Sequence, residues 1–429
     1  MLAYDQSPPF SAPMRFFLTA PLFLTLAGVM LLIDGDSLLA SRWTPGALAA
    51  THLITVGFML QVMLGALIQI MPVLTGASLP RPLWLARLVH AGLSVGALLL
   101  AAGFRWGHPE FLTWAAVLLG LSVLLFLVFA GLALRKVPTT SPSTRGIKLS
   151  LWGLLGGIGL GVALAGAIAR GWGFFTPALV DLHAGIGLAV WAGLLLAAIA
   201  YVVVPMFQLT PAYPTALGWR FPLAVIVAVT AWGLGVAVGH EALGRVGQGL
   251  LALLGAAFCG FTLRLQSLRR RAKSDVTSRY WQLGLIAGAL ALAMLATTAI
   301  RPGIADDPAW TPVFGLLLIA GGFVPLIVGM MCKIVPFLAW LQLQDFGRQR
   351  VAAPPMNKLL PEGAAEYQRR AYVLALALLV PAPMLPELLA RPAGLALAVA
   401  GLWLAWNLAG AGRRYRQARR DIAQKQAVK

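Results

Sequence analysis

Apolar runs long enough to cross a lipid bilayer recur along almost the whole chain. A membrane span needs roughly 20 mostly apolar residues, because the hydrocarbon core is about 30 Å thick and an α-helix rises about 1.5 Å per residue. We therefore predict an all-α polytopic membrane protein with twelve transmembrane helices. They lie near residues 13–33, 45–72, 89–104, 112–134, 149–169, 180–207, 221–239, 246–265, 281–300, 311–340, 371–390 and 393–411.

The connections between these runs differ sharply in charge. With the N-terminus inside, 27 of the 33 Lys and Arg residues fall in inner segments, including a basic tail at 413–429. The remaining six lie in outer loops: Arg42, Arg105, Arg170, Arg245, Arg301 and Arg391. The positive-inside rule then places both termini on the cytoplasmic side of a bacterial-type inner (plasma) membrane.

Composition supports the same reading of the chain. Hydrophobic residues make up 59% of it and charged residues 11%, against about 25% charged residues in soluble domains, which excludes an ordinary soluble enzyme. The two cysteines exclude a disulfide scaffold. The net charge of +19 marks orientation, so we expect the lipid bilayer as a partner and not nucleic acid. The stretch 342–370 is expected to be an inner loop.

A threefold repeat is visible in the proline positions. The predicted helices at 45–72, 180–207 and 311–340 each end near an apolar-Pro sequence at Pro72, Pro205 and Pro336, which are 133 and 131 residues apart. This spacing predicts one transmembrane domain with a pseudo-threefold arrangement of three four-helix modules, at about 1–148, 149–280 and 281–412. The alternative is coincidence, because proline and glycine are common in membrane helices.

Histidines near the outer ends of two of these helices are the main candidates for chemistry. His52 and His183 precede their prolines by 20 and 22 residues, and His240 follows the helix at 221–239 on the same side. Imidazole is a common ligand of heme iron and copper. We therefore predict that His52 and His183 bind a cofactor, with His240 as a third metal ligand. The alternative is an interfacial histidine hydrogen-bonded to a neighbour.

Sulfur ligands form a second candidate site. Met330 and Cys332 lie close together before Pro336, and thioether and thiolate groups suit Cu(I). The competing interpretation is ordinary core packing, because methionine fills irregular gaps in apolar interiors. No phosphate-binding loop, nucleophile triad or paired-cysteine zinc motif is present in the sequence.

Twelve helices, inner termini, three modules and these histidines together resemble the catalytic subunit of heme-copper oxidases and the related NnrS family. The resemblance implies heme and copper as cofactors. It implies a heme ligand at His52, a copper ligand at His183, and one remnant of a histidine pair at His240. Oxidases carry two further histidines on the tenth helix, whereas residues 311–340 contain none.

Three functions follow as hypotheses. The first is a heme- or copper-binding membrane protein that acts in nitric oxide response, electron transfer or metal handling, with a respiratory-chain or redox partner subunit. The second is a transporter for a metal ion or small solute, with the proline-containing helices along its path. The third is a non-catalytic assembly factor of a respiratory complex.

Overall fold

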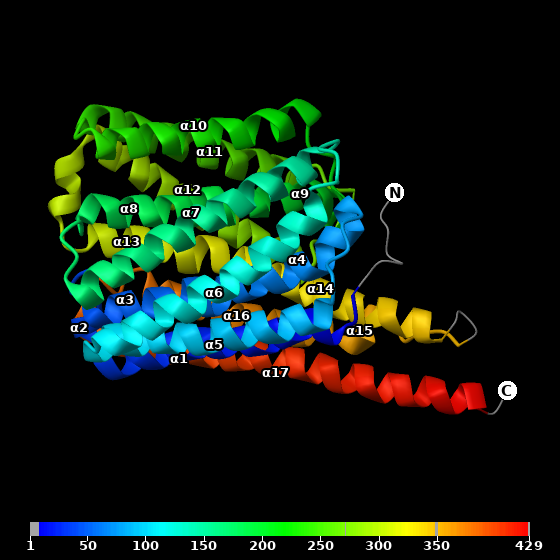
Figure 1. Cartoon of the computed structure of the whole chain (residues 1–429). Helices are drawn as coiled ribbons and strands as arrows, with labels where there is room; N and C mark the ends of the chain where they lie inside the picture. Colours follow the sequence, from blue (N-terminus) through cyan, green and yellow to red (C-terminus); the bar gives the residue numbers. More distant parts are fainter. Residues whose placement is uncertain (1–7, 271, 348–350, 428–429) are drawn as a thin grey trace.

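Long helices that run side by side make up the computed structural model of this chain (Figure 1). It describes residues 8–270, 272–347 and 351–427, and these residues contain no β-strand. Within them, eleven helical segments are long and apolar enough to cross a membrane, so the chain is a multi-pass membrane protein. The segments are Ser11–Asp34 (α1), Pro45–Thr75 (α3, η2 and α4), Pro82–Trp106 (α5), Pro109–Leu134 (α6), Pro142–Arg170 (α7), Pro177–Gln208 (α8, η3 and α9), Thr215–Ala237 (α10), Glu241–Ser267 (α11), Val276–Ile300 (α12), Trp310–Phe346 (α13, η5 and α14) and Pro386–Ala427 (α17).

The twelfth predicted span differs from the structure in its position and polarity. The helix expected near 371–390 is α16, at Glu362–Leu379. Pro381 and Pro383 prevent it from continuing, because proline lacks the N–H that an interior helix position donates. Its first half carries four charged residues, so α16 is not among the eleven apolar segments although it packs against α17.

The region 342–370, expected to be a loop, is largely helical. The helix α14 (Val324–Phe346) continues ten residues past Pro336, and a short helix α15 (Met356–Leu359) precedes α16. The helix expected at 393–411 is the much longer α17, which extends through the basic tail to Ala427. At about 1.5 Å per residue its 42 residues span roughly 63 Å, about twice the thickness of the hydrocarbon core. Four residues of the predicted inner basic segments lie outside the described residues: Arg271, Arg348, Arg350 and Lys429.

Three of the spans contain a π-helical segment at corresponding positions. These segments are η2 (Leu53–Leu60), η3 (Ile186–Gly193) and η5 (Leu317–Phe323), and each begins 19 residues before Pro72, Pro205 or Pro336. The prolines lie inside α4 (Gln61–Thr75), α9 (Leu194–Gln208) and α14, and do not end them as the sequence suggested. Extended π-helix is rare and is frequent at functional sites, so these three helices frame the search for a site.

The first and last spans pack against each other through glycines. A Cβ atom added at Gly28 would lie 2.4 Å from the backbone nitrogen of Ala398, and one at Gly394 would lie 2.4 Å from that of Leu32. Such contacts require glycine, which lets the two backbones approach closely. The N-terminal helix is thereby fixed to the C-terminal one.

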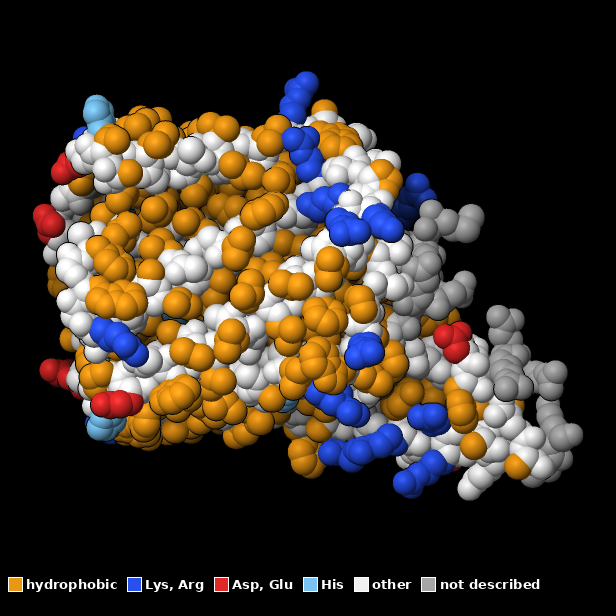
Figure 2. Space-filling model, in the orientation of Figure 1, with side chains coloured by type: hydrophobic (Ala, Val, Ile, Leu, Met, Phe, Trp, Pro, Cys, Tyr) orange, Lys and Arg blue, Asp and Glu red, His pale blue; other side chains and the backbone are white. Residues whose placement is uncertain are grey.

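Charge separates the two ends of the bundle. Figure 2 shows a broad hydrophobic band, with most visible Lys and Arg at the end near both termini and most visible Asp and Glu at the other. We call these the basic end, which carries Arg15 and Arg145, and the acidic end, which carries Asp34 and Glu110. The apolar band is the surface that contacts the bilayer lipids.

Candidate functional site

Two helices present histidines at the acidic end by the same local construction. The helices α3 (Pro45–His52) and α8 (Pro177–Gly185) both begin with a Thr-Pro pair. The hydroxyls of Thr44 and Thr176 accept hydrogen bonds from backbone N–H groups of the first turn. His52 is the last residue of α3, and His183 lies three residues before η3. Equivalent capping therefore places the two imidazoles just above a π-helical segment.

The hydrogen bonds of the two histidines define their tautomers. His52 Nδ1 lies 2.7 Å from the Leu48 carbonyl oxygen, and His183 Nδ1 lies 3.1 Å from the Gly157 carbonyl oxygen. A carbonyl oxygen only accepts, so each Nδ1 must carry the proton and donate. In the neutral ring the Nε2 atom then keeps its lone pair, which is the arrangement of a metal-ligating histidine.

The two histidines also lie near each other. A positive charge on His52 would repel one on His183 at their separation, although 131 residues divide them along the chain. Arg42, in the loop before α3, joins the two elements through a two-pronged ion pair with Asp181, which lies two residues before His183. The His52 ring packs against Phe104, with ring centroids 5.1 Å apart. The sequence did not predict the Arg42–Asp181 pair, because no periodic pattern links a loop residue to a distant helix.

His240 occupies a different environment. It is exposed and caps the N-terminus of α11, where its Nδ1 accepts a hydrogen bond from the Leu243 N–H at 3.2 Å. Figure 1 shows α10 and α11 across the bundle from α3. The structure therefore brings together His52 and His183, and it gives His240 a capping position away from them.

Met330 and Cys332 lie in the basic half of α14. Met330 is buried, Cys332 is partly exposed, and the following Lys333 pairs with Asp275 at 3.1 Å. Across the part of the chain that the structure describes, no three His, Cys, Asp or Glu side chains come together as a potential metal site. Cys332 and the histidines consequently do not share one centre.

Asp275 is the N-cap of α12 and lies just outside that span. Burial alone would raise the pKa of its carboxyl, but hydrogen bonds from Ser278 and the charge of Lys333 outweigh burial and hold the pKa below its usual value. The carboxylate therefore stays ionised and anchors Lys333. Lys333 was expected to reach the inner face alone, and its pairing with Asp275 explains how the ammonium is stabilised there.

A cavity of about 130 Å³ lies between α4, α9 and α14. Its walls repeat: residues ten, nine, six and two before each proline, and one and two after it, line the cavity in all three helices. At six residues before, for example, these are Ala66, Ile199 and Met330. The walls are apolar except at Gln69 and Trp281, whose Nε1 has no hydrogen-bond partner.

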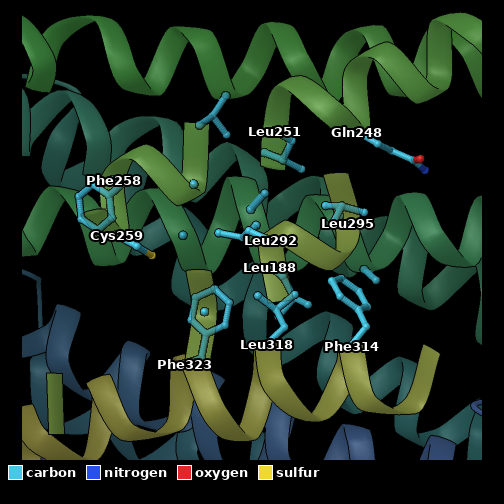
Figure 3. Close-up of a pocket in the computed structure, with 18 of the residues that line it drawn as sticks. Leu188, Gln248, Leu251, Phe258, Cys259, Leu292, Leu295, Phe314, Leu318 and Phe323 are labelled. Atoms are coloured by element: carbon cyan, nitrogen blue, oxygen red, sulfur yellow. The ribbon is translucent and has the colours of Figure 1, made fainter. Parts of the chain in front are cut away.

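A larger cavity, of about 350 Å³, lies between η3, α11, α12 and η5. Figure 3 shows Leu251, Leu292 and Leu318 around this space, from three of these helices. Arg42 and Asp181 line it, but none of the five histidines does. The sequence did not predict this cavity, because its walls are glycines and ordinary apolar residues.

A scan against protein-family models finds no match to this sequence, and a search of curated proteins finds no relative. The site is therefore interpreted from its own geometry.

Proposed function

We propose that this membrane protein binds copper or heme iron through the Nε2 atoms of His52 and His183. One observation carries the proposal: each Nδ1 donates to a backbone carbonyl, which leaves both Nε2 lone pairs available on neighbouring helices. The bound metal would supply one-electron redox chemistry or a binding site for a small ligand. Such a site suits electron transfer, metal handling or nitric oxide response, alongside a respiratory or redox partner.

The donor set fits copper more closely than heme. The cavity with the larger volume has no histidine in its wall, so its residues offer no imidazole axial ligand to a heme. Two imidazoles suit a copper ion, which needs no macrocycle-sized slot. The chain contributes the fixed tautomers, and the Arg42–Asp181 pair holds the two helices together beside the histidines.

The oxidase-like arrangement is part of the same proposal. The three π-helical segments at one distance from three prolines, and the repeating walls of the central cavity, support a pseudo-threefold bundle of three four-helix modules. We further infer that the basic end faces the cytoplasm, because positively charged loops are retained there. The histidine pair then lies toward the outer face. A transport path is less favoured, because the central cavity has almost wholly apolar walls.

Metal titration tests this function. The purified protein is loaded with Cu(I) under reducing conditions against a competing chelator, and its absorption spectrum is recorded after expression with heme. We expect one metal per chain in the wild type and loss of that metal in His52→Ala and His183→Ala. His240→Ala is the matched control and should bind as the wild type does. A Soret band lost in the first two variants would assign heme instead of copper.

The opposite result is equally clear. If the double variant His52→Ala/His183→Ala binds as much copper as the wild type and shows the same spectrum, the proposed site is wrong.

A further inference from the structure

The larger cavity is deep as well as apolar. On α12 its wall runs from Gly284 to Thr298, a distance of about 21 Å at 1.5 Å per residue. A volume of about 350 Å³ over that depth gives a mean cross-section of about 17 Å². The cavity is therefore a narrow slot that runs along the helices.

Polarity changes along this slot. Its deep part is lined by side chains such as Phe258, Leu285 and Leu326. Arg42, Gln248 and Thr311 lie at the acidic end, where Ala184 and Ala305 are exposed and form the mouth. Each of these groups occupies the level at which a lipid has matching chemistry: hydrocarbon deep in the membrane and polar groups at its surface.

The helices around the slot are not packed against one another near its mouth. No residue from 171 to 190 is buried, although His183 and η3 lie in that range. In the corresponding part of the first module, Gly46, Ala49 and Leu53 are buried. An empty apolar volume forfeits the contacts of its lining atoms, so a slot of this size beside a bilayer favours an apolar occupant.

Cations at the mouth define the head group of that occupant. Arg42 lines the slot, and its charge is balanced by Asp181. Arg245 lies one turn before Gln248 on α11, so the two residues share a helix face toward the mouth. A phosphate at the membrane surface would meet this guanidinium, whereas a neutral head group would leave it without a matching charge.

We propose that this slot binds one acyl chain of a bilayer phospholipid, with its phosphate at the mouth beside Arg245 and Gln248. The site is separate from the histidine pair: it uses the opposite side of α8, and it does not depend on a metal. It would make a tightly held lipid an integral part of the protein between the second and third modules.

A space-filling substitution tests the proposal. A Cβ at Gly288 would be 3.8 Å from the Cys259 sulfur, an ordinary contact, so Gly288→Leu places a side chain in the slot without a backbone clash. Gly260→Leu is the matched control, because Gly260 is exposed on α11, is not in the slot wall and has no atom within 4 Å of an added Cβ. Tightly bound lipid is extracted after exhaustive detergent exchange and identified by mass spectrometry.

We expect one phospholipid per chain in the wild type and in Gly260→Leu, and loss of most of it in Gly288→Leu. Equal phospholipid in both variants, no retained phospholipid in the wild type, or a quinone or free fatty acid in its place would each overturn the proposal.

A thiol measurement covers the case in which Gly288→Leu does not fold. Cys259 lines the slot and becomes the single cysteine in Cys332→Ser. Labelling of the delipidated protein by N-ethylmaleimide should slow markedly when phosphatidylglycerol micelles are added back. An unchanged labelling rate in their presence would contradict occupation of the slot by phospholipid.

Discussion

At the scale of single residues, the buried tyrosine Tyr372 is the clearest case of a polar side chain that supports the backbone. Its hydroxyl donates to the carbonyl oxygen of Ala320 at 2.5 Å, within the π-helical segment η5. A buried carbonyl without a partner is costly, so this hydrogen bond helps to maintain the irregular helix.

Tyr372→Phe should therefore destabilise the protein by about 1–3 kcal/mol, because it leaves the Ala320 carbonyl without its donor. Denaturant-induced unfolding of the detergent-solubilised protein measures the change. Tyr367→Phe is the control on the same helix, since Tyr367 is exposed. Equal stability of the two variants would show that the Tyr372 hydroxyl contributes nothing.

The sequence predicted some of the site residues and missed others for identifiable reasons. His52 and His183 could be found because polar, titratable groups are conspicuous in apolar helices and because both kept a fixed distance from a proline. The same reasoning could not distinguish the capping role of His240, which depends on one backbone N–H, that of Leu243. Whether the paired histidines bind metal stays a prediction.

At the scale of helices, an ion cluster joins α12 to α16 at the basic end. Glu366 accepts hydrogen bonds from Arg369 at 2.8 and 2.9 Å, and it also pairs with Arg279 of α12 at 3.1 Å and Arg370 at 3.3 Å. The hydrogen bonds from Arg369, followed by the charges of the neighbouring arginines, lower the pKa of Glu366 to about 2.

This lowered pKa predicts a pH dependence with a definite sign. Glu366 contributes its full stabilisation above its unfolded pKa of about 4.3, and the contribution is lost as pH falls toward the folded pKa of about 2. Thermal unfolding between pH 6 and pH 2 should therefore show a smaller loss of stability in Glu366→Gln than in the wild type. Parallel pH profiles for the two proteins would contradict this assignment.

Helix boundaries illustrate what periodicity alone leaves open. Most apolar runs were located to within a few residues, but Thr-Pro pairs at Thr44, Thr176 and Thr311 would have aligned the three modules better than the prolines did. The end of α16 follows from Pro381, whereas its start depends on ion pairs of Glu366 that a hydropathy pattern does not reveal.

At the scale of the whole molecule, the separation of charge predicts orientation. The multi-pass helical fold was predicted correctly, because length and hydropathy suffice for it. Cavities were not, because a void between helices depends on side-chain packing and not on the polarity of any one residue.

The proposed orientation can be measured directly. A fluorescent protein that folds only in the cytoplasm, fused after Lys429, should be bright in cells, because the basic end is expected to remain inside. Alkaline phosphatase fused at the same position should be inactive, and fused into the loop after Trp106 it should be active. The reverse pattern would overturn the orientation.

The contact between α1 and α17 has a consequence for how the protein is made. The glycine face of α1 at Gly28 has its partner at Gly394 and Ala398, more than 360 residues later in the chain. At about 5–20 residues per second, the ribosome needs roughly 20–70 s to synthesise that interval. During this time α1 waits in the membrane with its contact face uncovered. The last span to emerge therefore completes the first, and a chain cut short before α17 leaves that face open to the wrong neighbour.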